Sequence, residues 1–265
     1  MTAFGDDPFS ERQLNFVASQ RIGIATRPRL KGEYPGLYAI TWDSLGERSF
    51  SYWRSDSAAR RLADDRAALR QSLTGRDLIR VSGITLAILT EEARRNLHDA
   101  LTRARTEGAK VAFDTNRRPA FWPDAHDARK AMTELLEISD IALPSWPDER
   151  VLFGDASPEE ACRRLRSLGV SEVALKLGAD GVLIVAEGVQ KVIPGLRNII
   201  PLDTTGAGGG FNGAYLAARL IGHPVEIAAR IAIKLAAEVI EGYGALAKPD
   251  ALRRCWAEAN TRALI

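Results

Sequence analysis

The stretch 203–211, Asp-Thr-Thr-Gly-Ala-Gly-Gly-Gly-Phe, places small residues directly before an apolar segment with helical periodicity. This pattern predicts a glycine-rich loop that opens a helix over 211–220. The first N–H groups of such a helix have no partner within it and lie at the positive end of its dipole, so they can bind phosphate oxygens. Asp203 is a candidate to act near a metal ion or a phosphate-bound water. A turn that only packs the helix against a strand explains the glycines equally well.

The composition is that of a globular protein. With 265 residues and 46% hydrophobic composition, the chain can bury a full core. A balance of 36 Lys and Arg against 34 Asp and Glu gives a net charge of +2, which indicates neither a nucleic acid nor a membrane as partner. Cys162 and Cys255 lack the spacing of a zinc site or a disulfide framework. Because no apolar run approaches membrane-spanning length and no signal-peptide pattern is seen, we expect a cytoplasmic protein.

Strands and helices alternate through most of the chain. The apolar patterns predict helices over 57–73, 90–107, 157–168, 211–220 and 224–242, and strands over 77–83, 111–114, 140–143, 172–177 and 182–185. Strand, helix and strand at this spacing imply a parallel sheet, and therefore an α/β protein.

Residues 36–54 have a different pattern, with alternation typical of a β-hairpin whose turn falls at 43–46. Alternation places Tyr38 on one face of the first strand, and Tyr52 with Arg54 on one face of the second. Aromatic side chains on a half-exposed hairpin need a cover. A bound substrate, the hairpin's own domain or a second subunit would each provide one.

Three motifs together resemble one family. The 203–208 motif with Phe211 resembles the C-terminal signature of the ribokinase-like (PfkB) carbohydrate kinases, and 114–122 resembles their Asp-x-Asn-x-Arg-x-x-x-Trp element. Residues 36–38, 52–54 and 57–59 are similar to the 2-keto-3-deoxygluconate kinase (2-dehydro-3-deoxygluconokinase) branch of the family. The resemblance implies one ribokinase-like domain over 1–265, a three-layer α/β sandwich with a mostly parallel central sheet and a small β lid at 34–56. The lid of such kinases often meets a second subunit, so a homo-oligomer is expected.

The resemblance also implies ATP and Mg²⁺ as cofactors, without a side chain that binds the metal directly. Gly206, Ala207 and Gly208 correspond to the anion hole that stabilises the transferred phosphoryl group. The next position is an aspartate in the family, the base that takes the proton from the sugar hydroxyl, and here it is Gly209. We therefore expect phosphorylation of a sugar acid to be impaired.

Further nucleotide-binding positions follow from the same resemblance. Ser145, Lys176, Gly178 and Gly181 match family positions near the nucleotide phosphates. The alternatives are a plain turn after a strand for Ser145, a β-turn for the two glycines, and a Lys176 side chain that extends to water.

The implied sugar-acid site contains Tyr38, Tyr52, Arg54, Ile84 and Arg118. An arginine can pair with a carboxylate through two hydrogen bonds, while tyrosine hydroxyls bind the sugar. The alternatives are a surface ion pair of Arg54 with the nearby Asp56, an ordinary apolar loop residue at 84, and Arg117 in place of its neighbour.

Two features favour a second hypothesis, a catalytically inactive homologue that binds a sugar acid or a nucleotide. One is Gly209. The other is the start of the resemblance at Gly5, since the family's first strand and its Gly-Gly sugar-binding motif have no counterpart here. A kinase for fructose or another ketose is a third possibility, because the N-terminal part of the sugar site is not present to read.

Overall fold

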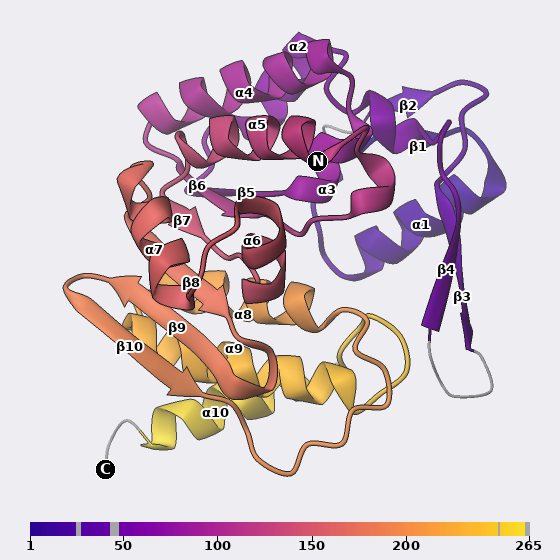
Figure 1. Cartoon of the computed structure of the whole chain (residues 1–265). Helices are drawn as coiled ribbons and strands as arrows, with labels where there is room; N and C mark the ends of the chain where they lie inside the picture. The colour runs from indigo at the N-terminus through magenta and orange to yellow at the C-terminus, as the bar shows by residue number, and fades with distance from the viewer. Residues whose placement is uncertain (25–27, 43–47, 249, 263–265) are drawn as a thin grey trace. The chain divides into compact units, whose positions relative to one another are not determined.

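The computed structural model describes residues 1–24, 28–42, 48–248 and 250–262 (Figure 1). Within it the chain forms two compact units. Unit 1 comprises residues 1–110 and 118–123, and unit 2 comprises residues 111–117 and 124–265. The expected single domain over 1–265 stays a prediction, and the hairpin turn expected at 43–46 lies outside the described residues.

Unit 1 consists of strands and helices, of which two helices begin at capping aspartates. The elements are β1 (Phe4–Gly5), α1 (Pro8–Ser19), β2 (Arg29–Leu30), β3 (Leu37–Trp42), β4 (Arg48–Trp53), η1 (Ala58–Arg61), α2 (Arg66–Leu73), β5 (Leu78–Ser82), α3 (Gly83–Ile88), α4 (Glu91–Thr106) and η2 (Pro119–Phe121). Asp7 begins α1 by accepting hydrogen bonds from the N–H groups of Phe9 and Ser10. Asp65 begins α2 in the same way, so the helix expected over 57–73 is instead the 3-10 turn η1 followed by a shorter helix.

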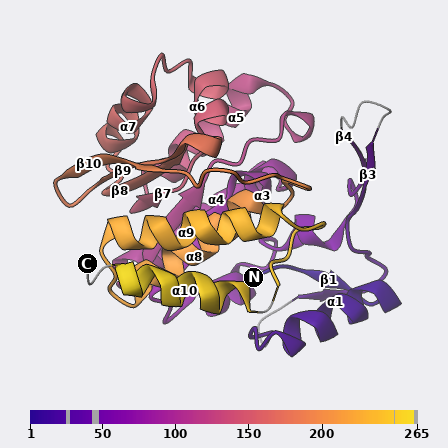
Figure 2. The same cartoon turned by 90° about the horizontal axis from the view of Figure 1, so that it is seen from below.

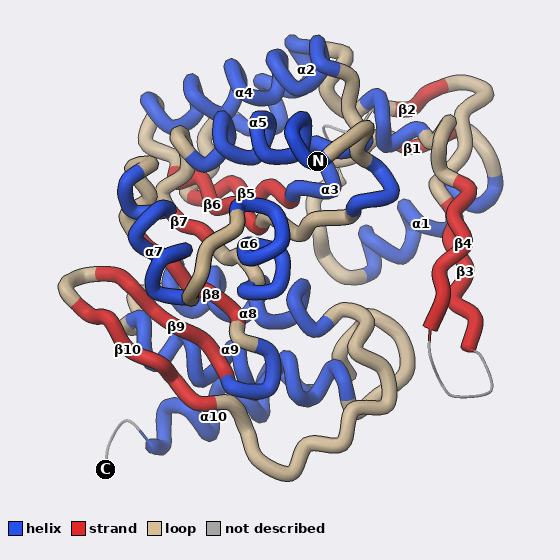
Figure 3. Tube along the Cα trace, viewed as in Figure 1, coloured by secondary structure: helices blue, strands red, loops and turns tan. Residues whose placement is uncertain are grey.

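The hairpin expected from the alternating pattern is present as the antiparallel pair β3 and β4 (Figure 3). Its register sets Tyr38 directly opposite Tyr52, so the two rings share one face. Gly36 lets the strands begin close together, because a Cβ at this position would lie 2.9 Å from the Cβ of Arg54.

Unit 2 contains a sheet with helices on both faces. The elements are β6 (Lys110–Asp114), α5 (Ala125–Leu136), β7 (Ile141–Ala142), α6 (Trp146–Phe153), α7 (Pro158–Ser167), β8 (Glu172–Lys176), η3 (Gly178–Asp180), β9 (Gly181–Ala186), β10 (Val189–Pro194), α8 (Ala207–Leu220), α9 (Val225–Ile240) and α10 (Ala251–Arg262). The strand order is β10-β9-β8-β7-β6, parallel from β6 to β8 and antiparallel for β9 and β10. Figure 2 shows α5, α6 and α7 on one side of strands β7 to β10, and α8, α9 and α10 on the other.

The core of unit 2 forms where α8 and α9 pack against each other and α9 covers β9. Tyr215 and Ile231, one on each helix, are completely buried. Gly210 permits the close approach, since a Cβ there would lie 3.1 Å from a methyl group of Val239. Across the described ranges, no helix combines the length and the apolar character needed to span a bilayer.

Candidate functional site

The glycine-rich stretch opens α8 as predicted. Gly206 is the residue before the helix and adopts a left-handed conformation with φ of 88°. A Cβ at Gly206 would lie 2.5 Å from the carbonyl oxygen of Ala245, so the position requires glycine for both its backbone angle and its space. The loop is therefore shaped by contact with the turn at 242–245.

The first turn of α8 directs N–H groups outward. The N–H of Ala207 donates to Thr204, and the first regular helical bond runs from Gly210 to Gly206, at 2.8 Å. Gly208 and Gly209 precede that regular bond, so their N–H groups point away from the helix at its N-terminus. At Gly209 a Cβ would have no heavy atom within 4 Å, whereas a Cβ at Gly208 would lie 3.8 Å from the ammonium nitrogen of Lys176.

Asp203 connects two loops. Its Oδ1 accepts a hydrogen bond from the N–H of Thr205 at 2.9 Å, and its Oδ2 accepts one from the N–H of Gly244 at 3.0 Å. The side chain is buried. The side chain therefore joins the 203–205 loop to the turn at Gly244, and its role near a metal ion or a phosphate-bound water stays a prediction.

Lys176 lies in a buried polar cluster at the end of β8. Its ammonium group is 3.3 Å from Oδ1 of Asp114 and donates to Oδ1 of Asn212 at 3.1 Å. The amide group of Asn212 donates to Oδ2 of Asp114 at 2.6 Å, which closes a ring of three side chains. The Lys176 side chain is only 14% exposed, so it does not extend to water as the alternative interpretation required. Its charge lies beside the start of α8.

Ser145 lies next to Lys176 in space. The two residues form a parallel bridge, and the N–H of Lys176 donates to the carbonyl of Pro144 at 2.9 Å. Ser145 is half-buried at the start of α6, where its hydroxyl makes no hydrogen bond to the helix. The structure therefore brings together Ser145, Lys176 and Gly208, which the sequence had placed in one nucleotide site, and their role toward a nucleotide stays a prediction.

Gly178 and Gly181 occupy the turn between the antiparallel strands β8 and β9. Both have positive φ, 67° and 106°. A Cβ at Gly181 would lie 2.1 Å from the carbonyl oxygen of Ile193, so this glycine is needed for the turn whatever else it does. Gly178 is exposed, and its role toward a nucleotide stays a prediction.

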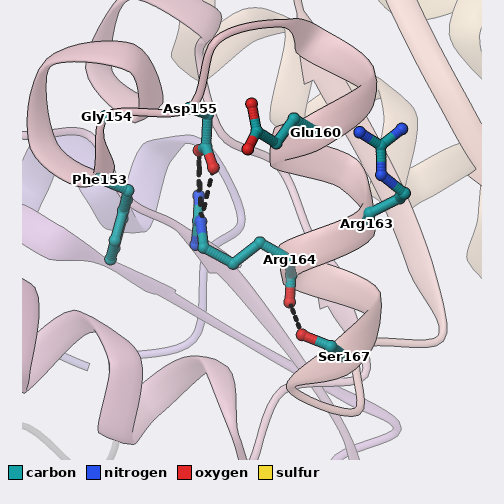
Figure 4. Close-up of a pocket in the computed structure, with 7 residues that line it drawn as sticks. All are labelled: Phe153, Gly154, Asp155, Glu160, Arg163, Arg164 and Ser167. Atoms are coloured by element: carbon teal, nitrogen blue, oxygen red, sulfur yellow. Dashed lines mark hydrogen bonds and ion pairs between the residues drawn. The ribbon is translucent and has the colours of Figure 1, made fainter.

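A second buried polar network begins at Thr115, directly after β6, and was not predicted. The hydroxyl of Thr115 donates to Glu149 at 2.7 Å, and Arg164 donates to the same carboxylate at 2.6 Å. Burial raises the pKa of Glu149. Arg164 also pairs with Asp155 and lies 3.8 Å from the ring centre of Phe153, where it lines a pocket of about 480 Å³ (Figure 4). Single charged residues on amphipathic helices give no sequence signal for such a network.

Asn212 was missed as well, although a signal existed. It is fully buried in α8 beside Phe211 and Tyr215, which are also buried. A polar residue on an apolar helix face needs buried partners. The sequence did not show that these partners are Asp114 and Lys176.

Unit 1 gathers the aromatic and cationic residues predicted for the sugar acid. The rings of Tyr38 and Tyr52 are 6.3 Å apart, and Phe121 meets Tyr52 edge to face at 4.9 Å. The guanidinium of Arg54 lies 5.1 Å from the ring centre of Phe121, and its Nε is buried without a hydrogen-bond partner in the described part of the chain. Asp56 accepts a hydrogen bond from Ser55, and no ion pair joins it to Arg54 among the described residues.

Ile84 and Arg118 are also in unit 1. Ile84 is half-buried in α3, a short helix that begins directly after β5, where the sequence suggested a loop. Helix α3 contacts η2, the turn that carries Phe121. Arg118 is exposed at the start of η2, whereas Arg117 is half-buried and belongs to unit 2. The structure places the helix of Ile84 against the turn that carries Phe121, and the roles of Ile84 and the two arginines stay predictions.

Comparisons with known proteins identify the family of the chain. Residues 1–251 match the pfkB family carbohydrate kinases. The chain is 37% identical over 261 residues to the 2-dehydro-3-deoxygluconokinase of Dickeya dadantii, and 36% identical over 259 residues to that of Escherichia coli K12. Each alignment covers 95% of this chain and 83% of the relative.

A solved structure shows the same fold. It is a candidate ribokinase II from Escherichia coli in complex with ATP and Mg²⁺, with a TM-score of 0.86 and 23% identity, covering 99% of this chain and 82% of that one. The expected ribokinase-like α/β fold is therefore confirmed. The family match over nearly the whole chain shows that this protein belongs to the PfkB family of carbohydrate kinases, which are phosphotransferases.

Proposed function

We propose that this chain transfers the terminal phosphoryl group of ATP to a sugar acid, most simply 2-keto-3-deoxygluconate, which becomes its 6-phosphate. The observation that carries the proposal is the Lys176 ammonium group beside Gly208 at the N-terminus of α8. A fixed cation next to outward N–H groups is an arrangement that binds phosphate. The relatives named 2-dehydro-3-deoxygluconokinase support the choice of sugar acid.

The nucleotide is proposed to bind in unit 2. Lys176 and the N–H groups at the start of α8 would bind phosphate oxygens and stabilise charge on the transferred group. Ser145 lies close enough to Lys176 to contribute a hydroxyl, and Gly178 would allow the backbone near the phosphates.

Magnesium is proposed to enter with ATP and to bind its phosphates, where it neutralises their charge. The residues of unit 2 fit a metal that is held by the nucleotide. Of the carboxylates near the start of α8, Asp203 binds two backbone N–H groups and Asp114 binds Lys176 and Asn212. We therefore propose no direct side-chain ligand for the metal.

The sugar acid is proposed to bind in unit 1. Arg54 offers a buried Nε without a partner in the described chain, which suits a carboxylate that arrives with the substrate. Tyr38 and Tyr52 add hydroxyl groups on the same face of the hairpin. A neutral ketose such as fructose would leave this cation uncompensated, so a ketose kinase is the weaker proposal.

Gly209 is the observation that favours a second candidate, a homologue that binds its ligands without turning them over. It has no side chain to accept the proton of the sugar hydroxyl, so a contribution of about 10²–10⁴-fold from a general base is missing. Positioning and electrostatic stabilisation would still support slow turnover. We propose impaired catalysis for the chain as it stands.

The hairpin is proposed to be the contact between two copies of the chain. Leu37 and Trp53 are each 61% exposed on it, and Tyr38 is 45% exposed. Large apolar side chains gathered on one exposed hairpin are typical of an interface. A cytoplasmic location remains a prediction from the sequence.

An ADP-release assay with MgATP tests the proposed activity, with 2-keto-3-deoxygluconate, fructose or no sugar added. We expect slow ADP release that depends on the sugar acid. Faster release with fructose would move the proposal to a ketose kinase. No release in any arm, together with measured binding of MgATP and the sugar acid, would favour the non-catalytic homologue, and no binding of either would overturn the proposed function.

A further inference from the structure

We propose that Asn212 is a positioning residue, which holds the ammonium group of Lys176 against the phosphate-binding start of α8. The inference rests on the proposed function, because it concerns the nucleotide phosphates of that same site. It adds a role for a residue that no sequence motif indicated.

The contacts place Asn212 between the two charged partners. Its Oδ1 accepts from Lys176 at 3.1 Å and its Nδ2 donates to Asp114 at 2.6 Å. Asn212 is completely buried, so water does not compete for either hydrogen bond. One amide therefore fixes the position of both the ammonium and the carboxylate.

The helix geometry connects this amide to the phosphate site. Asn212 follows Gly208 by four residues, so both lie on the same face of α8, one turn apart. The helix that presents the outward N–H groups thus also carries the residue that orients the cation. The result is an ammonium nitrogen 3.8 Å from the Cβ position of Gly208.

The physical benefit is preorganisation. A lysine side chain has a flexible four-carbon stem, and fixing it when the ligand binds costs side-chain entropy. Without Asn212, the ammonium group would lose the hydrogen bond that it donates to this amide, and Asp114 would lose the one that it accepts from it. With Asn212 present, the ordering of Lys176 is complete before the nucleotide binds, which favours affinity.

The test compares MgATP binding by isothermal titration calorimetry for the parent chain, Asn212→Leu, Lys176→Met and the double variant. Leucine matches asparagine in size and shape but makes no hydrogen bond. We expect Asn212→Leu to weaken MgATP binding roughly tenfold, since a charge-assisted contact is lost. The double variant should bind no more weakly than Lys176→Met alone, because Asn212 acts through the lysine.

A matched control separates this effect from general destabilisation. Asn96 is another buried asparagine, which donates to a backbone carbonyl in unit 1. Asn96→Leu should lower the thermal midpoint and leave the MgATP affinity within about twofold of the parent. Affinity for the sugar acid should stay unchanged in Asn212→Leu.

A second measurement does not depend on the nucleotide. The ¹⁵N resonance of the Lys176 ammonium group is assigned by its absence in Lys176→Met. We expect to observe it in the parent, where the ammonium protons exchange slowly with water, and to lose it in Asn212→Leu, where they exchange faster. If that variant fails to fold, Asn212→Ser replaces it, because serine is too short to contact both partners.

The outcomes separate the inference from the proposed function. Parent-like MgATP affinity in folded Asn212→Leu, or an additive loss in the double variant, overturns the positioning role. Failure of the parent itself to bind MgATP overturns the nucleotide site of the proposed function, and the role toward phosphate with it.

Discussion

Restoring a carboxylate at Gly209 should convert the chain into a faster kinase. Gly209 is exposed, occupies the third position of α8, and has open space around its Cβ direction. An aspartate there fits without displacing a neighbour. Its carboxylate would lie on the first turn of α8, next to the N–H group of Gly208 and the ammonium group of Lys176.

The expected size of the effect follows from the general base and from the helix. Proton transfer by a positioned base contributes about 10²–10⁴-fold, so kcat of Gly209→Asp should rise by at least about 100-fold. The variant should not lose stability, since an acidic residue in the first turn gains about 0.3–1 kcal/mol from the helix dipole. Replacement of a helical glycine adds a few tenths of a kcal/mol.

The assay is ADP release with MgATP and 2-keto-3-deoxygluconate, at saturating concentrations of both. Gly209→Asn controls for size, because its amide does not accept the proton as a base. Gly213→Asp is the matched control for charge, since Gly213 is exposed on the same helix and a Cβ there also meets no atom within 4 Å. Both controls should keep the parent rate.

A Gly209→Asp variant that binds MgATP and the sugar acid but turns over no faster than Gly209→Asn would show that position 209 does not carry the base. An equal gain in Gly213→Asp would show the same, because added negative charge and not a placed base would then explain the rate.

Three further predictions concern the sugar acid, the helix start and a buried carboxyl group. In the faster Gly209→Asp background, Arg54→Lys should raise KM for the sugar acid about tenfold by loss of two-point pairing, with KM for ATP unchanged. The control is Arg70→Lys, at an exposed position of α2, and it should change neither constant. An equal rise in both constants for Arg54→Lys would contradict the assignment. Gly206→Ala should lower the unfolding free energy by about 1–3 kcal/mol, because the residue has a φ of 88°. Gly208→Ala should leave the unfolding free energy from urea titrations unchanged and weaken MgATP binding. Equal unfolding free energies for the two variants would contradict the prediction. Burial raises the pKa of Glu149 above its ordinary value of 4.5, so the folded state holds this proton more tightly than the unfolded state. The unfolding free energy of the parent relative to Glu149→Gln should therefore fall as pH rises from 4.5. Urea unfolding at pH 4.5 and pH 7 checks the sign, and a relative unfolding free energy that rises with pH would contradict it.

The sequence predicted those parts of the fold that depend on local patterns. The helix opened by Gly206, the hairpin with Tyr38 opposite Tyr52, and the strand that carries Lys176 all follow from periodicity and glycine placement. The helix predicted over 57–73 was too long. In the structure α2 begins only after Asp65, whose side chain caps it, and the periodicity of the sequence did not show this start.

The rest of the site depends on contacts between residues far apart in the chain. Asp114 and Asn212 are 98 positions apart, and no local pattern pairs them. The sequence also did not show that Asp203 accepts a hydrogen bond from the N–H of Gly244, and its predicted role near a metal ion stays a prediction. The inward direction of Lys176 likewise follows from the carboxylate that the fold places beside β8.

A crystal structure of the parent chain with Mg²⁺ and a non-hydrolysable ATP analogue would locate the phosphates directly. We expect the terminal phosphate at the start of α8, with its oxygens accepting hydrogen bonds from the N–H of Gly208 and from the ammonium group of Lys176. A nucleotide whose phosphates lie away from α8, with Lys176 still bound only to its protein partners, would contradict this expectation.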